Sequence, residues 1–194
     1  MKLVKSLGLL LLSGAFAFTA NAQKIKVTEG SLDAVKGVTE YKLEFTYNDL
    51  AVGKFKDEAE YIAKKKEEYN KKEAGKGDKW AESWISDREG RFEPKFTELF
   101  TEYSKATVSD KAKYTLIFHT TFIEPGFNIG VMRKNAEING EVTIVETANP
   151  GKVLAKLTIT KSPGAQFGGY DFDTGVRIAE AYAKAGKEIG KKVK

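Results

Sequence analysis

The spacing of the apolar residues changes along the chain, and these changes restrict the folds open to it. Residues 41–47, YKLEFTY, alternate apolar and polar side chains as a half-buried strand does. Residues 57–105 follow helical spacing, residues 112–160 return to alternation, and residues 173–192 are helical again. This order predicts an α+β domain, a two-layer sandwich with helices packed on a mainly antiparallel sheet.

Three helices are expected in the first helical stretch, at residues 57–74, 79–89 and 93–105. Asp57, followed three residues later by Glu60, resembles a capping box that begins with Asp. Asp78 can cap the second helix, and Pro94 suits the first turn of the third. Each boundary therefore has a local physical cause.

The second helix carries both tryptophans of the chain. Trp80 and Trp84 are four residues apart, so they lie on one helix face. We interpret them as packing anchors. The alternative is an aromatic platform for a sugar or a peptide.

Three strands are expected in the second alternating stretch, at residues 112–123, 138–147 and 152–160. With residues 41–47 and a short edge strand before them, they would form a sheet of four to five strands. Three Pro-Gly pairs, beginning at Pro125, Pro150 and Pro163, suit type II turns at the strand ends.

The last helix, residues 173–192, carries a stripe of small residues beside its apolar face. Small side chains allow a close approach, so we expect this helix to lie very near the sheet. The stripe consists of Gly175, Ala179, Ala183, Gly186 and Gly190.

Residues 1–22 have the pattern of a signal peptide. Lys2 and Lys5 precede a short apolar core, and Ala20-Asn21-Ala22 is a small-residue cleavage site. The core is too short for a membrane span, and we expect none in the remaining chain. Cleavage after Ala22 would leave residues 23–194 as one α+β domain, periplasmic or secreted.

Composition excludes several classes of function. The chain has no cysteine, which excludes a disulfide framework, thiolate chemistry and a lipid-modified cysteine. The formal charge of +5 includes Lys2 and Lys5, and no broad basic stripe with interleaved aromatic residues is present, so nucleic acid is not an expected partner.

No motif in the sequence indicates a particular enzymatic reaction. His119 is the only histidine, and it lies in an expected strand, where a structural role is the simplest interpretation. Phosphate-loop, dinucleotide, zinc-protease and nucleophile-elbow patterns do not occur in the sequence, so we assign no catalytic residue, metal or cofactor. We interpret Asp171 and Asp173 mainly as helix caps, and ligand contact and metal binding are the alternatives.

Two glycine-rich loops, residues 124–136 and 162–173, should share one edge of the sheet. Successive antiparallel strands place the loop after 112–123 and the loop after 152–160 on the same side. Both loops carry apolar residues that a solvated loop does not need. The candidate ligand or partner residues are Phe127, Asn128, Met132, Arg133, Phe167, Tyr170, Asp171 and Asp173.

The segments GSLDAVKG, EPKFTELF, PGFNIGVMRKNAEINGEVTIVETANPGKVLAK and GYDFDTGVRIAEAYAKAGKEIGK resemble an uncharacterised family of small secreted proteins from Gram-negative bacteria. That resemblance covers nearly the whole chain after residue 22 and implies no activity. GKVLAK and RIAEAYAKAGKEIG are also similar to envelope lipoproteins with a domain like the amino-terminal domain of TolB, which are assembly or interaction modules. The missing cysteine departs from that pattern.

These observations predict a non-enzymatic secreted or cell-envelope module that binds a protein, peptide or glycan through the two loops. The alternative is a small-ligand or metal-binding protein, for example a hydrolase, that uses Arg133, Asp171 and Asp173 in those loops. The two hypotheses differ in whether small ligands stabilise the chain.

Overall fold

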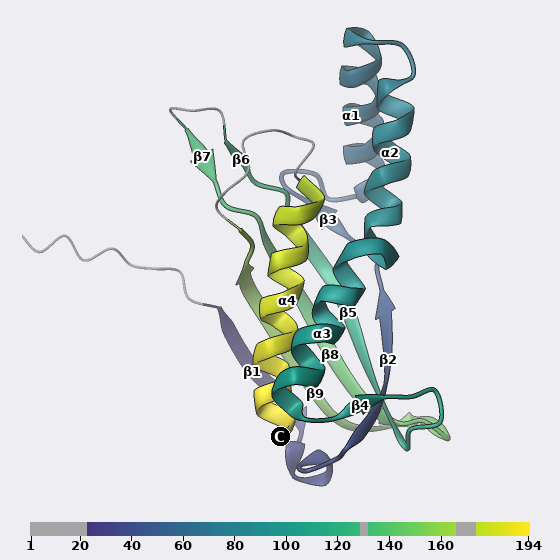
Figure 1. Cartoon of the computed structure of the whole chain (residues 1–194), viewed down its shortest axis with the longest axis vertical. Coiled ribbons are helices and arrows are strands. Elements are labelled where there is room, and N and C mark those ends of the chain that lie inside the picture. Colours follow the sequence, from purple (N-terminus) through teal and green to yellow (C-terminus); the bar gives the residue numbers. More distant parts are fainter. Residues whose placement is uncertain (1–22, 129–131, 166–173) are drawn as a thin grey trace, which may run out of the picture.

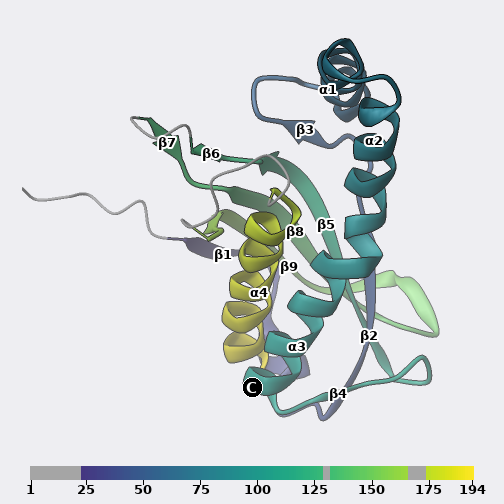
Figure 2. The same ribbon diagram turned by 45° about the horizontal axis from the view of Figure 1, so that its top comes forward.

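The computed structural model describes residues 23–128, 132–165 and 174–194 of the chain. It has an α+β architecture, in which a large twisted sheet is crossed on one face by two helices (Figure 1). A hairpin of two further helices projects beyond one end of the sheet (Figures 1 and 2).

The large sheet contains seven strands among the described residues, in the order β1-β9-β8-β5-β2-β4, with the short β3 also paired to β5. The edge strand expected before residue 41 is present as β1. The bounds are β1 Lys24–Gly30, β2 Glu40–Thr46, β3 Ala51–Val52, β4 Thr107–Val108, β5 Tyr114–Glu124, β8 Glu137–Glu146 and β9 Asn149–Pro163.

The expectation of a mainly antiparallel sheet with four to five strands is wrong. β5, β8, β9 and β1 are antiparallel, but β2 runs parallel to β5 and to β4, and β3 runs parallel to β5. The cause is the helical stretch between β2 and β5. It serves as a crossover that returns the chain to the starting end of the sheet, as a parallel pair requires.

All expected helices form: α1 Glu58–Lys72, α2 Lys76–Asp87, α3 Glu93–Ser104 and α4 Thr174–Val193. A π-helical turn, Arg88–Phe92, joins α2 to α3, and a short 3₁₀ helix, Leu32–Val35, follows β1. α3 and α4 cover one face of the sheet, whereas α1 and α2 form the projecting hairpin (Figure 2). The expectation that all helices pack on the sheet holds for α3 and α4, whereas the α1–α2 hairpin projects beyond the sheet and meets it through α1 and β3.

The helix boundaries confirm two of three expected signals. The Asp57 side chain accepts hydrogen bonds from the N–H groups of Ala59 and Glu60, at 2.6 and 3.4 Å. Pro94 lies in the first turn of α3. Asp78 does not cap α2, which begins at Lys76 after Gly75 in the left-handed region.

One of the three Pro-Gly pairs, at Pro125, has the backbone expected of a type II turn, and the other two do not. Gly126 has φ +69°, as a type II turn requires. Pro150 and Gly151 lie inside β9 instead, and the hairpin between β8 and β9 turns at residues 147–148. Pro163 ends β9, and Gly164 does not have a positive φ.

The small-residue stripe of α4 lies against α3, not against the sheet. A Cβ added at Gly186 would lie 2.2 Å from the Phe96 carbonyl oxygen, and one at Gly190 would lie 2.7 Å from that of Phe100. The two helix backbones are thus nearly in contact. The apolar face of α4, which includes Ile178, faces the core.

Aromatic rings fill the core between the helices and the sheet. Phe96 lies 4.9 Å from Phe118 between ring centroids, and Phe92 stacks on Tyr182 at 5.0 Å with an interplanar angle of 8°. These four side chains are fully buried or nearly so. No helix in the described part of the chain is long and apolar enough to cross a membrane.

Candidate functional site

The two loops do meet at one edge of the sheet. Glu124 at the end of β5 pairs with Glu137, and Glu137 pairs with Pro163 at the end of β9. The Gly164 N–H also donates to the Ala136 carbonyl at 2.7 Å, so the bases of the two loops are joined. This confirms the expected placement of the loop ends.

The first loop forms a small hairpin, β6 Phe127–Asn128 and β7 Arg133–Lys134. The side chains of Phe127 and Met132 remain 39% and 58% exposed, and Arg133 is exposed as well. Four candidate residues lie outside the described residues: Phe167, Tyr170, Asp171 and Asp173.

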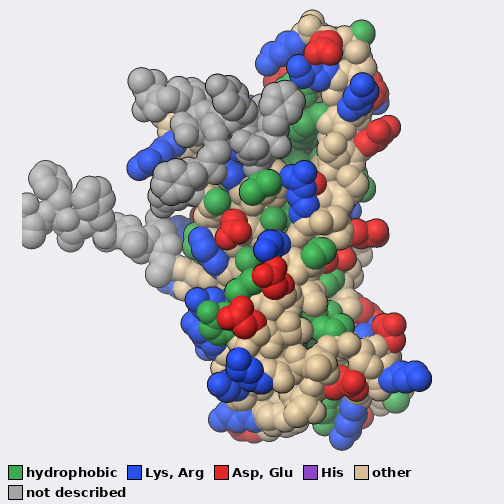
Figure 3. Space-filling view, in the orientation of Figure 1, with side chains coloured by type: hydrophobic (Ala, Val, Ile, Leu, Met, Phe, Trp, Pro, Cys, Tyr) green, Lys and Arg blue, Asp and Glu red, His purple; other side chains and the backbone are tan. Residues whose placement is uncertain are grey.

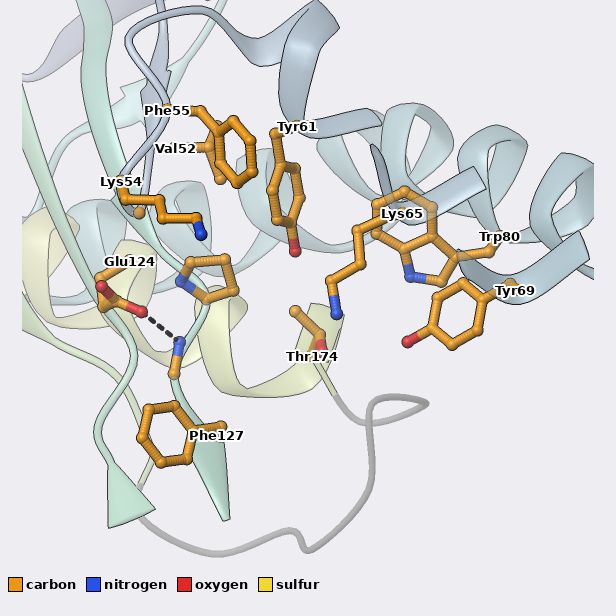
Figure 4. Close-up of a pocket in the computed structure, with 13 residues that line it drawn as sticks. Val52, Lys54, Phe55, Tyr61, Lys65, Tyr69, Trp80, Glu124, Phe127 and Thr174 are labelled. Atoms are coloured by element: carbon orange, nitrogen blue, oxygen red, sulfur yellow. Dashed lines mark hydrogen bonds between the residues drawn. The ribbon is translucent and has the colours of Figure 1, made fainter. Parts of the chain in front are cut away.

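Phe127 lines a hollow that extends from this edge of the sheet to the projecting helix hairpin. This hollow has a volume of about 180 Å³, and an adjoining one of about 310 Å³ shares Tyr69, Trp80 and Thr174 with it. We call the two together the aromatic cleft. Its aromatic lining consists of Phe55, Tyr61, Tyr69, Trp80 and Phe127, which Figure 4 shows, and of Trp84 in the larger hollow.

The rings of the hairpin pack on one another in a continuous chain. Tyr61 lies 5.0 Å from Trp84, and Trp80 stacks on Trp84 at 5.6 Å with an angle of 27°. Tyr69 and Phe55 extend the chain at either end, each 5.7 Å from a neighbour. The interpretation of the tryptophans as packing anchors is confirmed for Trp84, which is buried; Trp80 is only partly buried and lines both hollows.

Cations surround these rings. Figure 4 shows the amines of Lys54 and Lys65 pointing into the space between the rings. Lys65 lies 5.4 Å from the centroid of Tyr69, and Lys54 lies 5.6 Å from that of Phe55, both within the range of cation–π attraction. Figure 3 shows hydrophobic side chains along the inner side of the hairpin, and basic and acidic ones together at its tip.

Among the described residues, the two carboxylates that line the cleft have cationic partners. Glu124 is ion-paired with Lys134 and accepts a hydrogen bond from the Gly126 N–H at 3.1 Å. Asp87 is paired with Arg91 at 3.0 Å. Partial burial raises the pKa of Asp87, and Arg91 opposes this shift.

A polar network fixes the base of the hairpin to the domain. The Trp84 indole N–H and Arg88 both donate to the Glu58 carboxylate, at 2.7 and 2.5 Å. The Arg88 guanidinium lies 4.3 Å from the ring centroid of Tyr47, whose hydroxyl donates to Glu93. Burial raises the pKa of Tyr47, so its hydroxyl stays protonated and can serve as this donor.

His119 lies away from the cleft. Its Nδ1 atom is 2.9 Å from the Thr46 hydroxyl on the neighbouring parallel strand, an interaction between two half-buried side chains. No group of three or more His, Cys, Asp and Glu residues in the described segments is placed to hold a metal ion. The cleft therefore offers stacking surfaces and cations.

No family model matches the sequence, and no curated protein matches it. Among solved structures, a PelC dodecamer variant from Paraburkholderia phytofirmans is similar at 11% identity, with 84% of this chain and 96% of that chain covered and a TM-score of 0.38. A second PelC dodecamer gives 14% identity, coverages of 84% and 97%, and a TM-score of 0.37. Protein XCC0632 from Xanthomonas campestris, of family DUF330, is 12% identical, with 78% of this chain and 82% of that chain covered and a TM-score of 0.36. Likenesses this loose assign neither a family nor a function.

Sequence reasoning found only part of this site. It identified Phe127 in the loop and the shared face of Trp80 and Trp84, but it did not bring them together. Sequence reasoning did not single out the other three aromatic residues of the lining: Phe55 precedes the Asp57 cap, and Tyr61 and Tyr69 lie on α1.

Proposed function

We propose that the protein is a non-enzymatic module of the cell envelope or of the secreted proteins, and that it holds a partner in the aromatic cleft. The observation that supports this most is that Phe127, an exposed loop residue, lines the same hollow as the hairpin aromatics. A concave aromatic surface with a few charged groups is the usual form of a binding site. The partner that we propose is an envelope protein, a peptide or a glycan.

Substitutions at the cleft provide the test. Phe127→Ser and Trp80→Leu should each reduce capture of the partner from an extract of the native envelope, because both remove apolar surface from the lining. Ile85→Ser is the matched control, since Ile85 is 44% exposed on α2 and lines neither hollow. Equal capture by all three variants would refute the proposal.

A photo-crosslinking amino acid placed at position 127 should then form an adduct with the same partner. The same amino acid at position 85 should not. This experiment separates occupation of the cleft from binding elsewhere on the surface.

Export is part of the proposal, and it has its own test. Cleavage after Ala22 gives a mature chain that begins at Gln23. Intact mass measurement on protein from the periplasm or the medium should show this amino terminus. A chain that keeps residues 1–22 and stays in the cytoplasm would contradict it.

A small ligand is the second candidate, and the larger hollow favours it. Its volume of about 310 Å³ is at the lower limit of ligand pockets. A ligand at 100 times its Kd should raise the free energy of unfolding by about 2.7 kcal/mol. Thermal unfolding with calcium, magnesium, nucleotides and sugars would detect this, and an unchanged Tm across the panel would argue against it.

A further inference from the structure

We infer that the occupant of the aromatic cleft has a flat apolar body and a negative charge, as an aromatic carboxylate or an acidic residue beside an aromatic one has. This inference rests on the proposed function, because it specifies the chemistry of the ligand at the same site. Two independent features carry it: the apolar surface of the rings and the sign of the charge around them.

The apolar requirement comes from the position of Trp80. This side chain lines both hollows and is only partly buried, although it stacks on Trp84. Phe55 and Phe127 add partly exposed rings to the smaller hollow. A ring or another flat body that enters here would cover aromatic surface on several sides.

The charge requirement comes from Lys54 and Lys79. Lys54 lines the smaller hollow and Lys79 the larger one, both side chains are exposed, and no ion pair joins either of them to a described residue. The two carboxylates among the described lining residues, Glu124 and Asp87, are each paired with a cation, so they do not neutralise these lysines. The unbalanced charge of the described lining is positive.

Hydrogen-bond chemistry points the same way. Lysine amines donate hydrogen bonds and cannot accept them. The ligand must therefore supply acceptors, and a carboxylate or sulfonate does so with a charge that strengthens the bond. A neutral sugar also supplies hydroxyl acceptors, but it lacks the charge that strengthens a hydrogen bond from a lysine amine.

The test uses two dyes that differ in one group. Anilinonaphthalene sulfonate is an anion with a flat apolar body, and N-phenyl-1-naphthylamine is the same body without the sulfonate. Both tryptophans of the chain line the cleft, so energy transfer from them reports dye that binds close to it, and the variants below locate the site. We expect the anionic dye to bind the full chain saturably and more tightly than the neutral one.

Two pairs of lysines give the matched comparison. The double variant Lys54→Gln, Lys79→Gln should weaken binding of the anionic dye by roughly 2- to 5-fold for each lysine and leave the neutral dye unchanged. The control is Lys64→Gln, Lys71→Gln on α1, which removes the same charge from residues that line neither hollow. It should bind both dyes as the unchanged chain does.

Competition then identifies the source of the anion. Displacement of the dye by 4-phenylbutyrate indicates a free carboxylate, and displacement by the peptide acetyl-Phe-Glu-Phe-Asp-amide indicates an acidic peptide. Either result supports the inference. Failure of both to displace the dye would overturn it.

Two other outcomes would also overturn it. If the neutral dye binds as tightly as the anionic one and both lysine pairs behave alike, the cleft selects apolar bodies without regard to charge, while the proposed function stands. If the anionic dye binds only after residues 167–173 are replaced by Gly and Ser, the occupant is this chain's own segment. If Phe127→Ser also leaves partner capture intact, the proposed function fails separately.

Discussion

The close contact between α3 and α4 gives the sharpest stability prediction, the substitution Gly186→Ala. The added Cβ would lie 2.2 Å from the Phe96 carbonyl oxygen, whereas ordinary contact begins at 3.4 Å. Since the obstacle is backbone, no side-chain rotation relieves it. The two helices have to separate by roughly 1 Å, and neighbouring core contacts weaken with that shift.

The magnitude follows from two opposing terms. Overpacking of a core by a methyl group typically costs about 1–3 kcal/mol. Alanine is favoured over glycine within a helix by about 1 kcal/mol, which offsets part of the cost. We expect Gly186→Ala to lower the free energy of unfolding by about 0–2 kcal/mol, which corresponds to a fall in Tm of up to roughly 8 °C for a domain of this size.

The control is Gly90→Ala in the turn between α2 and α3. A Cβ at Gly90 meets nothing within 4 Å, and its φ is not positive, so the same chemical change should be neutral or stabilising there. Thermal unfolding followed by circular dichroism measures both variants. If Gly186→Ala proves as stable as Gly90→Ala, the two helices do not approach as closely as described and the reasoning fails.

Three further predictions concern the polar groups near the helix hairpin. Tyr182→Phe removes a buried hydroxyl 2.6 Å from that of Thr120 and should destabilise the domain by about 1–3 kcal/mol, measured by urea unfolding; a null effect would show that the bond contributes nothing. Glu58→Ala removes the carboxylate that pairs with Arg88. The α1–α2 hairpin of this variant should exchange its amide hydrogens faster than in the unchanged chain, whereas exchange in α4 should not change. Equal exchange of the hairpin in the variant and in the unchanged chain would contradict this. Burial raises the pKa of Glu93 above its ordinary 4.5, so the folded state binds the proton more tightly and the stability from this group is lost as pH rises. Glu93→Gln should therefore gain stability relative to the unchanged chain as pH rises above 4.5, and a difference that stays constant with pH would refute the assignment.

Local features of the sequence predicted the elements well, because their causes are local. The alternation of residues 41–47 and the Asp57 cap each depend on neighbours within a few positions, and both are present. The Asp78 cap is absent because Asp78 instead pairs with Lys66 at 2.6 Å and accepts from Asn70 at 3.0 Å, both on α1. Tertiary contact decided between two roles that the sequence allows equally.

The small-residue stripe shows a second limit. Its spacing on α4 correctly indicates a close approach, but the pattern carries no information on what approaches. The partner is α3, an element about 90 residues earlier in the chain, and Gly186 meets its backbone directly. A periodicity identifies a face and cannot identify its neighbour.

The position of the cleft depends on a single topological fact. Because β2 is parallel to β5, the carboxyl ends of both strands lie at the same edge of the sheet. β2 leads there to β3 and the α1–α2 hairpin, and β5 leads to Glu124 and Phe127, so the two halves of the lining meet. An antiparallel β2 would have sent the hairpin and both tryptophans to the opposite edge. The carboxyl edge of parallel strands is also where open sheets commonly bind ligands. The parallel pairing that the sequence did not predict is thus the feature that creates the candidate site.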